Sequence, residues 1–178
     1  MLNEKVEKAL NEQINAEMFS SYLYLSMSAY FQSLNMAGFA GWMKVQALEE
    51  LYHAMKIYGY IEERGGRVTL ETIEKPTRQW ESPLNAFEAA YQHERKVSGM
   101  IDQLVNLAID ERDHASNNFL QWFVSEQVEE EATADGVVQK LKLAGNQGSG
   151  LFMLDREMAM RAFNLPPDLK INVLTAQV

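Results

Sequence analysis

Cysteine is absent from this sequence of 178 residues, so the chain can contain neither a disulfide framework nor a thiolate metal site. Long apolar runs are absent too, and residues 1–15 mix Glu and Lys with isolated apolar side chains. This pattern fits neither a signal peptide nor a membrane-spanning segment. We therefore expect a cytoplasmic protein that does not bind membranes.

Basic residues are in the minority, with 16 Lys and Arg against 25 Asp and Glu and a net charge of −9. An acidic chain is poorly suited to nucleic acid, whereas it attracts cations. No linker rich in Pro and Ser divides the sequence, and 47% of its residues are apolar. One domain with a continuous core is therefore expected over residues 1–178.

Helical periodicity dominates the sequence, and no segment shows the alternation of a β-strand. We expect an all-α fold, with a bundle over about 4–143, a short fifth helix over about 151–162 and a flexible tail over about 166–178. The four long helices are expected over about 4–33, 36–64, 83–111 and 115–143.

Boundary residues and connection lengths support this architecture. Asn35 is expected to cap the second helix and Gly65 to end it, while Ser82, which precedes a proline, should cap the third. Short connections make the first and last helix pairs antiparallel hairpins. The segment over about 65–82 is long enough to cross a helix of roughly 40 Å, since an extended chain spans about 3.3 Å per residue. The second and third helices should therefore run parallel.

Each long helix carries an apolar seam that is interrupted near its middle by residue types that bind metals. The interruptions are Glu17, Glu50 with His53, Glu94, and Gln127 with Glu130. A single glutamate of this kind is usually a solvated residue at the edge of a seam. Four at one height would repel one another in the core, whereas two divalent cations would balance their charge.

An internal repeat supports the same site. Adding 77 to the residue numbers maps Glu17 onto Glu94, Glu50 onto Gln127 and His53 onto Glu130. The two hairpins are therefore expected to be related by a pseudo-two-fold axis through the site. Carboxylates with one imidazole suit Fe²⁺, Mn²⁺ or Zn²⁺, and among redox metals the hard oxygen ligands favour iron.

These residues resemble a known family, the ferritins of the prokaryotic, haem-free kind. Di-iron carboxylate bundles carry a Glu on each of two helices and a Glu-x-x-His motif on each of the other two. This chain has Glu17, Glu94 and one such motif, Glu50 to His53, but Gln127 to Glu130 departs from the second motif, as in ferritins proper. The resemblance covers about residues 3–163 and includes the stretches NEQINAEMFSSYLYLSM, ALEELYHAMK, ERGGRV and NFLQWFVSEQVEEEA. It implies a ferritin-like four-helix bundle with one long crossover.

The resemblance also implies residue roles. One iron would be held by Glu17, Glu50 and His53, and Glu50 would bridge to a second iron held by Glu94 and Glu130. Gln127 would hydrogen-bond water or a dioxygen-derived ligand. The remaining roles are a third iron site at Glu49, Glu126, Glu129 and Glu130, and an electron-donating tyrosine at Tyr24.

Simpler interpretations exist for several residues. The outer glutamates could be a solvated acidic face, and Tyr24 a plain core tyrosine. His93 points about 100° away from Glu94 around its helix and His114 lies at a helix junction, so neither is expected to bind metal. No haem is expected, because Leu51 occupies the position at which bacterioferritins place a haem-binding Met.

The function implied by the resemblance is iron storage. The chain would act as a ferroxidase, oxidising Fe²⁺ with dioxygen or hydrogen peroxide, and would keep the ferric mineral in a cage of about 24 identical subunits. One alternative is a related di-iron oxidase or peroxidase without mineral storage. Another is a non-catalytic cage subunit or helical scaffold.

Overall fold

The computed structural model describes residues 2–145 and 148–163, in which all regular structure is helical. The helices are α1 (Glu4–Ser33), α2 (Ala37–Glu63), α3 (Pro83–Asp110), α4 (His114–Ala144) and α5 (Gly148–Met158). The predicted all-α fold with four long helices and a short fifth is confirmed. The expected tail over 166–178 lies outside the described residues. Within them no helix is both long and apolar enough to cross a membrane.

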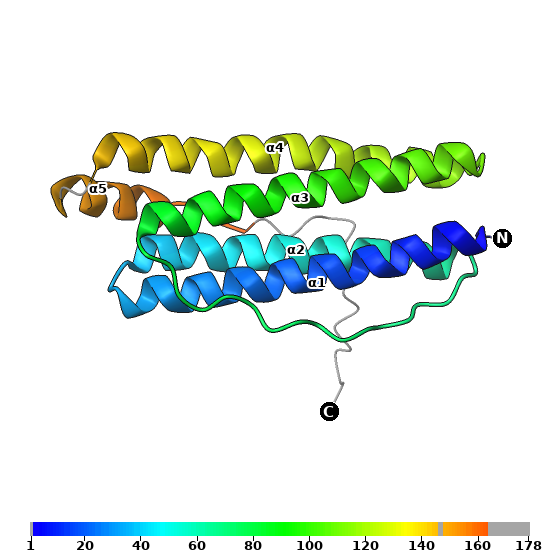
Figure 1. Cartoon of the computed structure of the whole chain (residues 1–178), viewed down its shortest axis with the longest axis horizontal. Helices are drawn as coiled ribbons and strands as arrows, with labels where there is room; N and C mark the ends of the chain where they lie inside the picture. The colour runs from blue at the N-terminus through cyan, green and yellow to red at the C-terminus, as the bar shows by residue number, and fades with distance from the viewer. Residues whose placement is uncertain (1, 146–147, 164–178) are drawn as a thin grey trace, which may run out of the picture.

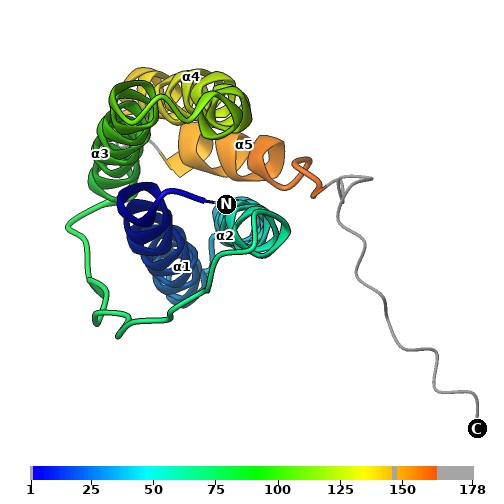
Figure 2. The ribbon, with the colours of Figure 1, turned by 90° about the vertical axis from the view of Figure 1, so that its right-hand side faces the viewer.

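The four long helices form two antiparallel hairpins, α1 with α2 and α3 with α4 (Figure 1). The segment over 64–82 runs along the outside of the bundle from the end of α2 to the start of α3, so α2 and α3 are parallel (Figure 1). This confirms the long crossover. Seen from the end, α5 packs beside α2 and α4 (Figure 2).

Capping explains most helix boundaries. Asn3 accepts a hydrogen bond from the backbone N–H of Lys5 at 2.9 Å at the start of α1. Ser82 accepts one from the N–H of Asn85 at 3.1 Å at the start of α3, as expected. Gly65 follows the end of α2 and has φ of +71°. Glycine adopts this left-handed conformation without a steric penalty.

The predicted cap of α2 at Asn35 is wrong. Asn35 has φ of +58° and its N–H bonds the carbonyl of Gln32, so it closes the end of α1 instead. Met36 is the first flanking residue of α2 and its side chain makes no capping bond. The carboxylate of Asp155 on α5 supplies one, accepting from the N–H of Phe39 at 2.9 Å. A distant residue therefore caps this helix.

The fifth helix begins and ends earlier than predicted, at Gly148–Met158 rather than 151–162. After Met158 the chain continues in turns, in which the N–H of Arg161 bonds the carbonyl of Met158 at 3.2 Å. The helix packs closely on α2 at Gly38, where an added Cβ would lie 1.6 Å from the backbone oxygen of Asp155. Only glycine allows this approach.

The core consists of two apolar clusters, one toward each end of the bundle. The cluster near α5 includes Phe31, Phe39, Met43, Phe87 and Leu141. The cluster at the opposite end includes Leu10, Ile14, Ile57, Ile101 and Leu120. Along every long helix the predicted metal-site residues lie between members of these two clusters. The bundle thus places a polar layer between two dry cores.

Candidate metal centre

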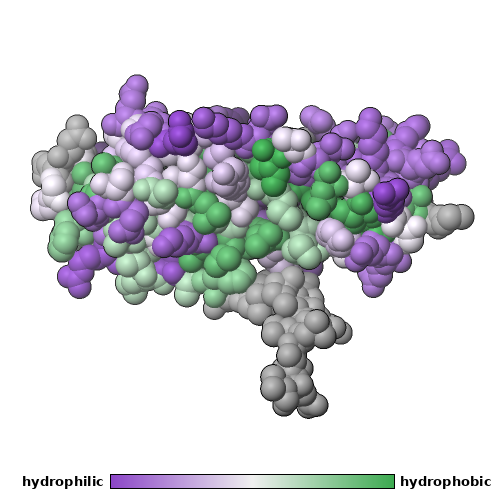
Figure 3. Space-filling view, turned by 90° about the horizontal axis from the view of Figure 1, so that it is seen from below, coloured by the Kyte–Doolittle hydropathy of each residue, from purple (hydrophilic) through white to green (hydrophobic). Residues whose placement is uncertain are grey.

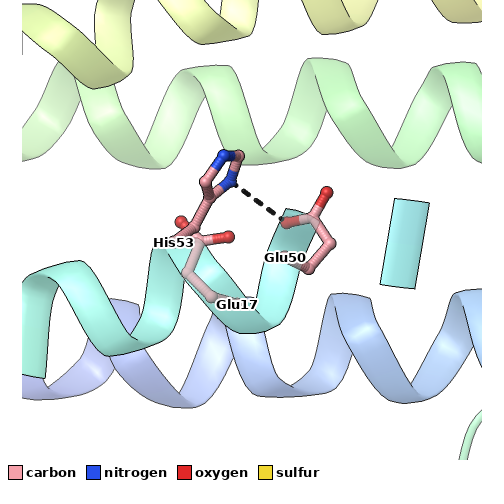
Figure 4. A group of neighbouring side chains, drawn as sticks. All are labelled: Glu17, Glu50 and His53. Atoms are coloured by element: carbon pink, nitrogen blue, oxygen red, sulfur yellow. Dashed lines mark ion pairs between the residues drawn. The ribbon is translucent and has the colours of Figure 1, made fainter. Parts of the chain in front are cut away.

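The first group of potential ligands comes from the α1–α2 hairpin. Glu17, Glu50 and His53 are each at most 2% exposed, and their ligand atoms lie within 4.8 Å of one another. Glu50 and His53 are three residues apart and so share one face of α2. Figure 4 shows the three side chains turned toward one another, with Nδ1 of His53 3.6 Å from Oε2 of Glu50. This arrangement suits one cation with two oxygen ligands and one nitrogen ligand.

A second group adjoins the first and spans three helices. Glu50, Glu94 and Glu130, from α2, α3 and α4, also have ligand atoms within 4.8 Å of one another. Glu50 belongs to both groups. A carboxylate has two oxygens, so one placed in this way can reach two cations at once.

Neutral side chains surround these carboxylates with hydrogen-bond donors. The Tyr24 hydroxyl donates to Glu94, and Nε2 of Gln127 lies 3.4 Å from Oε2 of Glu94. Nε2 of Gln46 lies 3.2 Å from Oε1 of Glu50 and also donates to Glu130. These donors hold the carboxylates in place but supply no positive charge.

The electrostatics oppose full ionisation of the cluster. Burial, and then the charges of Glu94 and Glu17, raise the pKa of Glu50 well above its ordinary value. Burial is also the main cause that raises the pKa of Glu94 to about 7. The pKa of Glu130 is raised well above normal by burial and by Glu50 and Glu94. A carboxylate cluster of this kind is ionised fully only when cations compensate it.

One buried carboxylate oxygen accepts no hydrogen bond from the residues that the structure describes. Oε1 of Glu17 accepts from Nε2 of Gln13 at 2.8 Å, whereas Oε2 of Glu17 is buried and has no hydrogen-bond partner among the described residues. An unsatisfied buried carboxylate oxygen is costly. It lies in the first ligand group, so a cation there would satisfy it.

A model of the ferritin-like domain matches residues 7–144. The chain belongs to the ferritin family. It is 48% identical to a bacterial non-heme ferritin of Bacteroides fragilis, over 90% of this chain and all of the relative. A bacterial non-heme ferritin of Campylobacter jejuni is 41% identical, over 88% of this chain and 93% of the relative. An open-pore ferritin of Archaeoglobus fulgidus superimposes with a TM-score of 0.90 and 52% identity, over 91% of this chain and all of that one.

The predicted outer glutamates of this ferritin are wetter than the inner ones. Glu49 and Glu126 are half-buried and Glu129 is exposed, and none of the three belongs to the two ligand groups found in the described part of the chain. Burial raises the pKa of Glu126, and Glu129 raises it further. Burial also raises the pKa of Glu49, although the neighbouring Arg161 lowers it. The third iron site remains a prediction.

The histidines that were not expected to bind metal lie apart from both groups of the ferritin centre. Nε2 of His93 is 2.8 Å from the Ser20 hydroxyl. Burial, with the charge of Lys96, lowers the pKa of His93 to about 4, so the ring is neutral at pH 7. His114 is exposed at the start of α4.

Three residues around the ferritin centre were not assigned by sequence reasoning. Gln13 and Gln46 each lie four residues before a proposed ligand, Glu17 and Glu50, and this spacing on one helix face could have revealed them. Arg161 reaches the centre from beyond α5 and contacts Gln46 at 2.8 Å. No local sequence pattern indicates that contact.

Proposed function

We propose that the two ligand groups form the iron-oxidising centre of this ferritin, which oxidises Fe²⁺ and stores the product as ferric mineral. The observation that supports this most directly is the place of Glu50 in both ligand groups. A dinuclear site with one shared carboxylate brings two Fe²⁺ ions close enough to reduce one oxidant together. The related chains of known structure are ferritins as well.

In this proposal one iron binds Glu17, Glu50 and His53, and the other binds Glu50, Glu94 and Glu130. Each Fe²⁺ loses one electron, so the pair converts one O₂ and two protons into one H₂O₂, or one H₂O₂ and two protons into two waters. Iron binding displaces protons from carboxylates whose pKa is raised. The centre therefore takes up iron and releases protons at neutral pH.

Two neighbours assist the pair. Gln127 would hydrogen-bond an oxygen ligand beside Glu94, to which its amide already lies close. Tyr24 would supply an electron, because its hydroxyl donates directly to Glu94 and can pass its proton there when the ring is oxidised. Burial raises the pKa of Tyr24 well above normal, so the ring stays a phenol until then.

A third iron would bind at Glu49, Glu126, Glu129 and Glu130. Burial raises the pKa of both Glu49 and Glu126, and the charge of Glu126 raises that of Glu49 as well. This site would be weaker than the inner pair, because its ligands are wetter and less constrained.

The third site is tested by the O₂ consumed per iron in a Glu49→Ala/Glu126→Ala/Glu129→Ala variant. An unchanged ratio, with no third metal peak in crystals of the unmutated protein soaked in Fe²⁺, would mean that these residues form a solvated acidic face and not a metal site.

We further propose that the chain assembles in the cytoplasm into a hollow cage. The cage would be a closed symmetric oligomer of about 24 subunits, as in other members of this family. Apolar surface is gathered along the face that carries α1 and the crossover segment (Figure 3). Exposed apolar residues on α1 and this segment include Tyr22, Leu25, Leu70 and Ile73. Patches of this kind on a soluble chain mark sites of association.

Aerobic loading of the purified protein with Fe²⁺, with particle mass measured before and after, tests storage. A ferritin gains far more iron than its centres can bind. A di-iron oxidase without storage would turn over while its mass stayed nearly constant, and a non-catalytic subunit would oxidise iron no faster than buffer does.

A further inference from the structure

Arg161 lies outside the proposed centre, but its side chain contacts residues beside the proposed ligands. It follows α5 in a turn, and its side chain reaches back to α2. Its guanidinium lies 4.1 Å from the centre of the Trp42 ring, donates to Oε1 of Gln46 at 2.8 Å and forms an ion pair with Glu49. The residues contacted are spaced by four and three positions, so they form one stripe along α2.

These three contacts hold the guanidinium firmly. An exposed ion pair alone would contribute little, but stacking on an aromatic ring and a hydrogen bond to a buried amide fix the orientation of the planar group. Trp42 is 5% exposed and Gln46 is 3% exposed, so both partners are part of the core. The side chain of Arg161 itself is 21% exposed.

The position of Arg161 matters because Glu49 is one of the proposed ligands of the third iron. A carboxylate that pairs with a guanidinium is stabilised in its ionised form, and the charge of Arg161 lowers the pKa of Glu49 against the effect of burial. A divalent cation at Glu49 would compete with this contact for the carboxylate and would be repelled by the arginine while it remained in place.

We propose that Arg161 is an internal competitor for the third iron: it occupies Glu49 until the ion displaces it, and so weakens and regulates that site. This inference rests on the proposed third site. Displacement also releases the oxygen of Gln46, whose amide donates to Glu50 and Glu130. Arg161 is thus a positioning residue that links the outer ion to the inner pair through Gln46.

The test is anaerobic calorimetric titration with Zn²⁺, which is redox-inert, of the whole protein. The third ion is identified as the one that Glu49→Gln removes. Arg161→Gln should tighten its binding on the order of tenfold, a typical coupling between linked sites. Arg161→Lys, which keeps the charge but not the planar group, should tighten it less than Arg161→Gln does. The matched control is Arg156→Gln, which removes the same charge from an exposed position of α5.

A structural readout accompanies the titration. In crystals soaked in Zn²⁺ the guanidinium should leave Glu49, and in unsoaked crystals it should pair with it. Three ions bound with an unchanged or weaker third affinity in Arg161→Gln would overturn the role of Arg161 while leaving the third site intact. Only two ions bound by every variant, Arg161→Gln included, would overturn the third site and this inference together.

Discussion

Glu50 contributes to both ligand groups, and His53 supplies their only nitrogen ligand among the described residues. Replacing either by alanine should lower the initial rate of Fe²⁺ oxidation by about tenfold or more, because a direct ligand is lost. The rate is followed by the absorbance of the ferric product. His114→Ala is the matched control. His114 is exposed at the start of α4, so its loss should leave the oxidation rate unchanged. Unmutated rates in both Glu50→Ala and His53→Ala would reject the centre.

Glu94 and Glu130 are acids whose ionisation opposes folding when no cation is bound. Their folded-state pKa is raised, that of Glu94 from 4.5 to about 7. Stability from such a group is fully present below its unfolded pKa and is lost as pH rises through the folded pKa. Metal-free protein should therefore be less stable at pH 8 than at pH 5 as far as these groups are concerned.

Glutamine at either position removes this penalty. Glu94→Gln or Glu130→Gln should stabilise the metal-free bundle at pH 8, by on the order of 1 kcal/mol, yet weaken Zn²⁺ binding. Thermal unfolding in chelator, compared at pH 5 and pH 8, gives the sign, and the gain should shrink at pH 5. Clear destabilisation by both changes would mean that something other than metal pairs with these carboxylates.

The helix α5 packs tightly on α2 at Gly38. At Gly38 a Cβ would meet the backbone oxygen of Asp155 at 1.6 Å, whereas at Gly41, on the same helix, it would meet nothing within 4 Å. Gly38→Ala should displace α5 and remove the Asp155 cap, which is worth roughly 1 kcal/mol in itself. Gly41→Ala should be neutral or slightly stabilising, because alanine favours helix. Amide exchange at the first turn of α2 reports the difference, and equal protection in both variants would contradict this account.

Prediction from sequence was most accurate where the cause is local. Residues 4–33 were expected as a helix and α1 spans Glu4–Ser33, and Ser82 caps α3 as its spacing before a proline indicates. The cap of α2 was assigned to Asn35 because the side chain type suits a cap, but the residue lies in the left-handed conformation that ends α1. The actual cap, Asp155, lies 116 residues from the N–H it accepts from, beyond any local pattern.

The candidate centre was predictable for a different reason. Carboxylates interrupt every apolar seam at one level, and the repeat between hairpins places them in register. The polar residues that support them divide into two classes. Gln46 interrupts its own seam and could have been found, whereas Arg161 reaches Glu49 only because α5 packs against α2.

For the whole molecule, the apolar face on α1 predicts assembly. Tyr22 is 50% exposed and Leu25 is 48% exposed, three residues apart on one helix face. Tyr22→Glu/Leu25→Glu should therefore give smaller particles by light scattering, while each subunit keeps its helical content. Gln32→Glu is the control, since Gln32 is an exposed polar residue of the same helix. Full-size particles from the double variant would show that this face is not an interface.

Because the ligands are divided between two hairpins, the two proposed ions should bind at different stages of folding. The ligands of the first group all belong to α1 and α2, whose connection is short, whereas the second group is complete only after the α3–α4 hairpin has docked. Contacts within a hairpin close a small loop and form early, but docking must also order the long crossover. Refolding in Co²⁺ should therefore show two spectral phases, of which only the slower responds to Glu94→Gln. The nascent chain would in this way acquire its first ion before its second hairpin is in place, and a single phase in Co²⁺ would exclude that order.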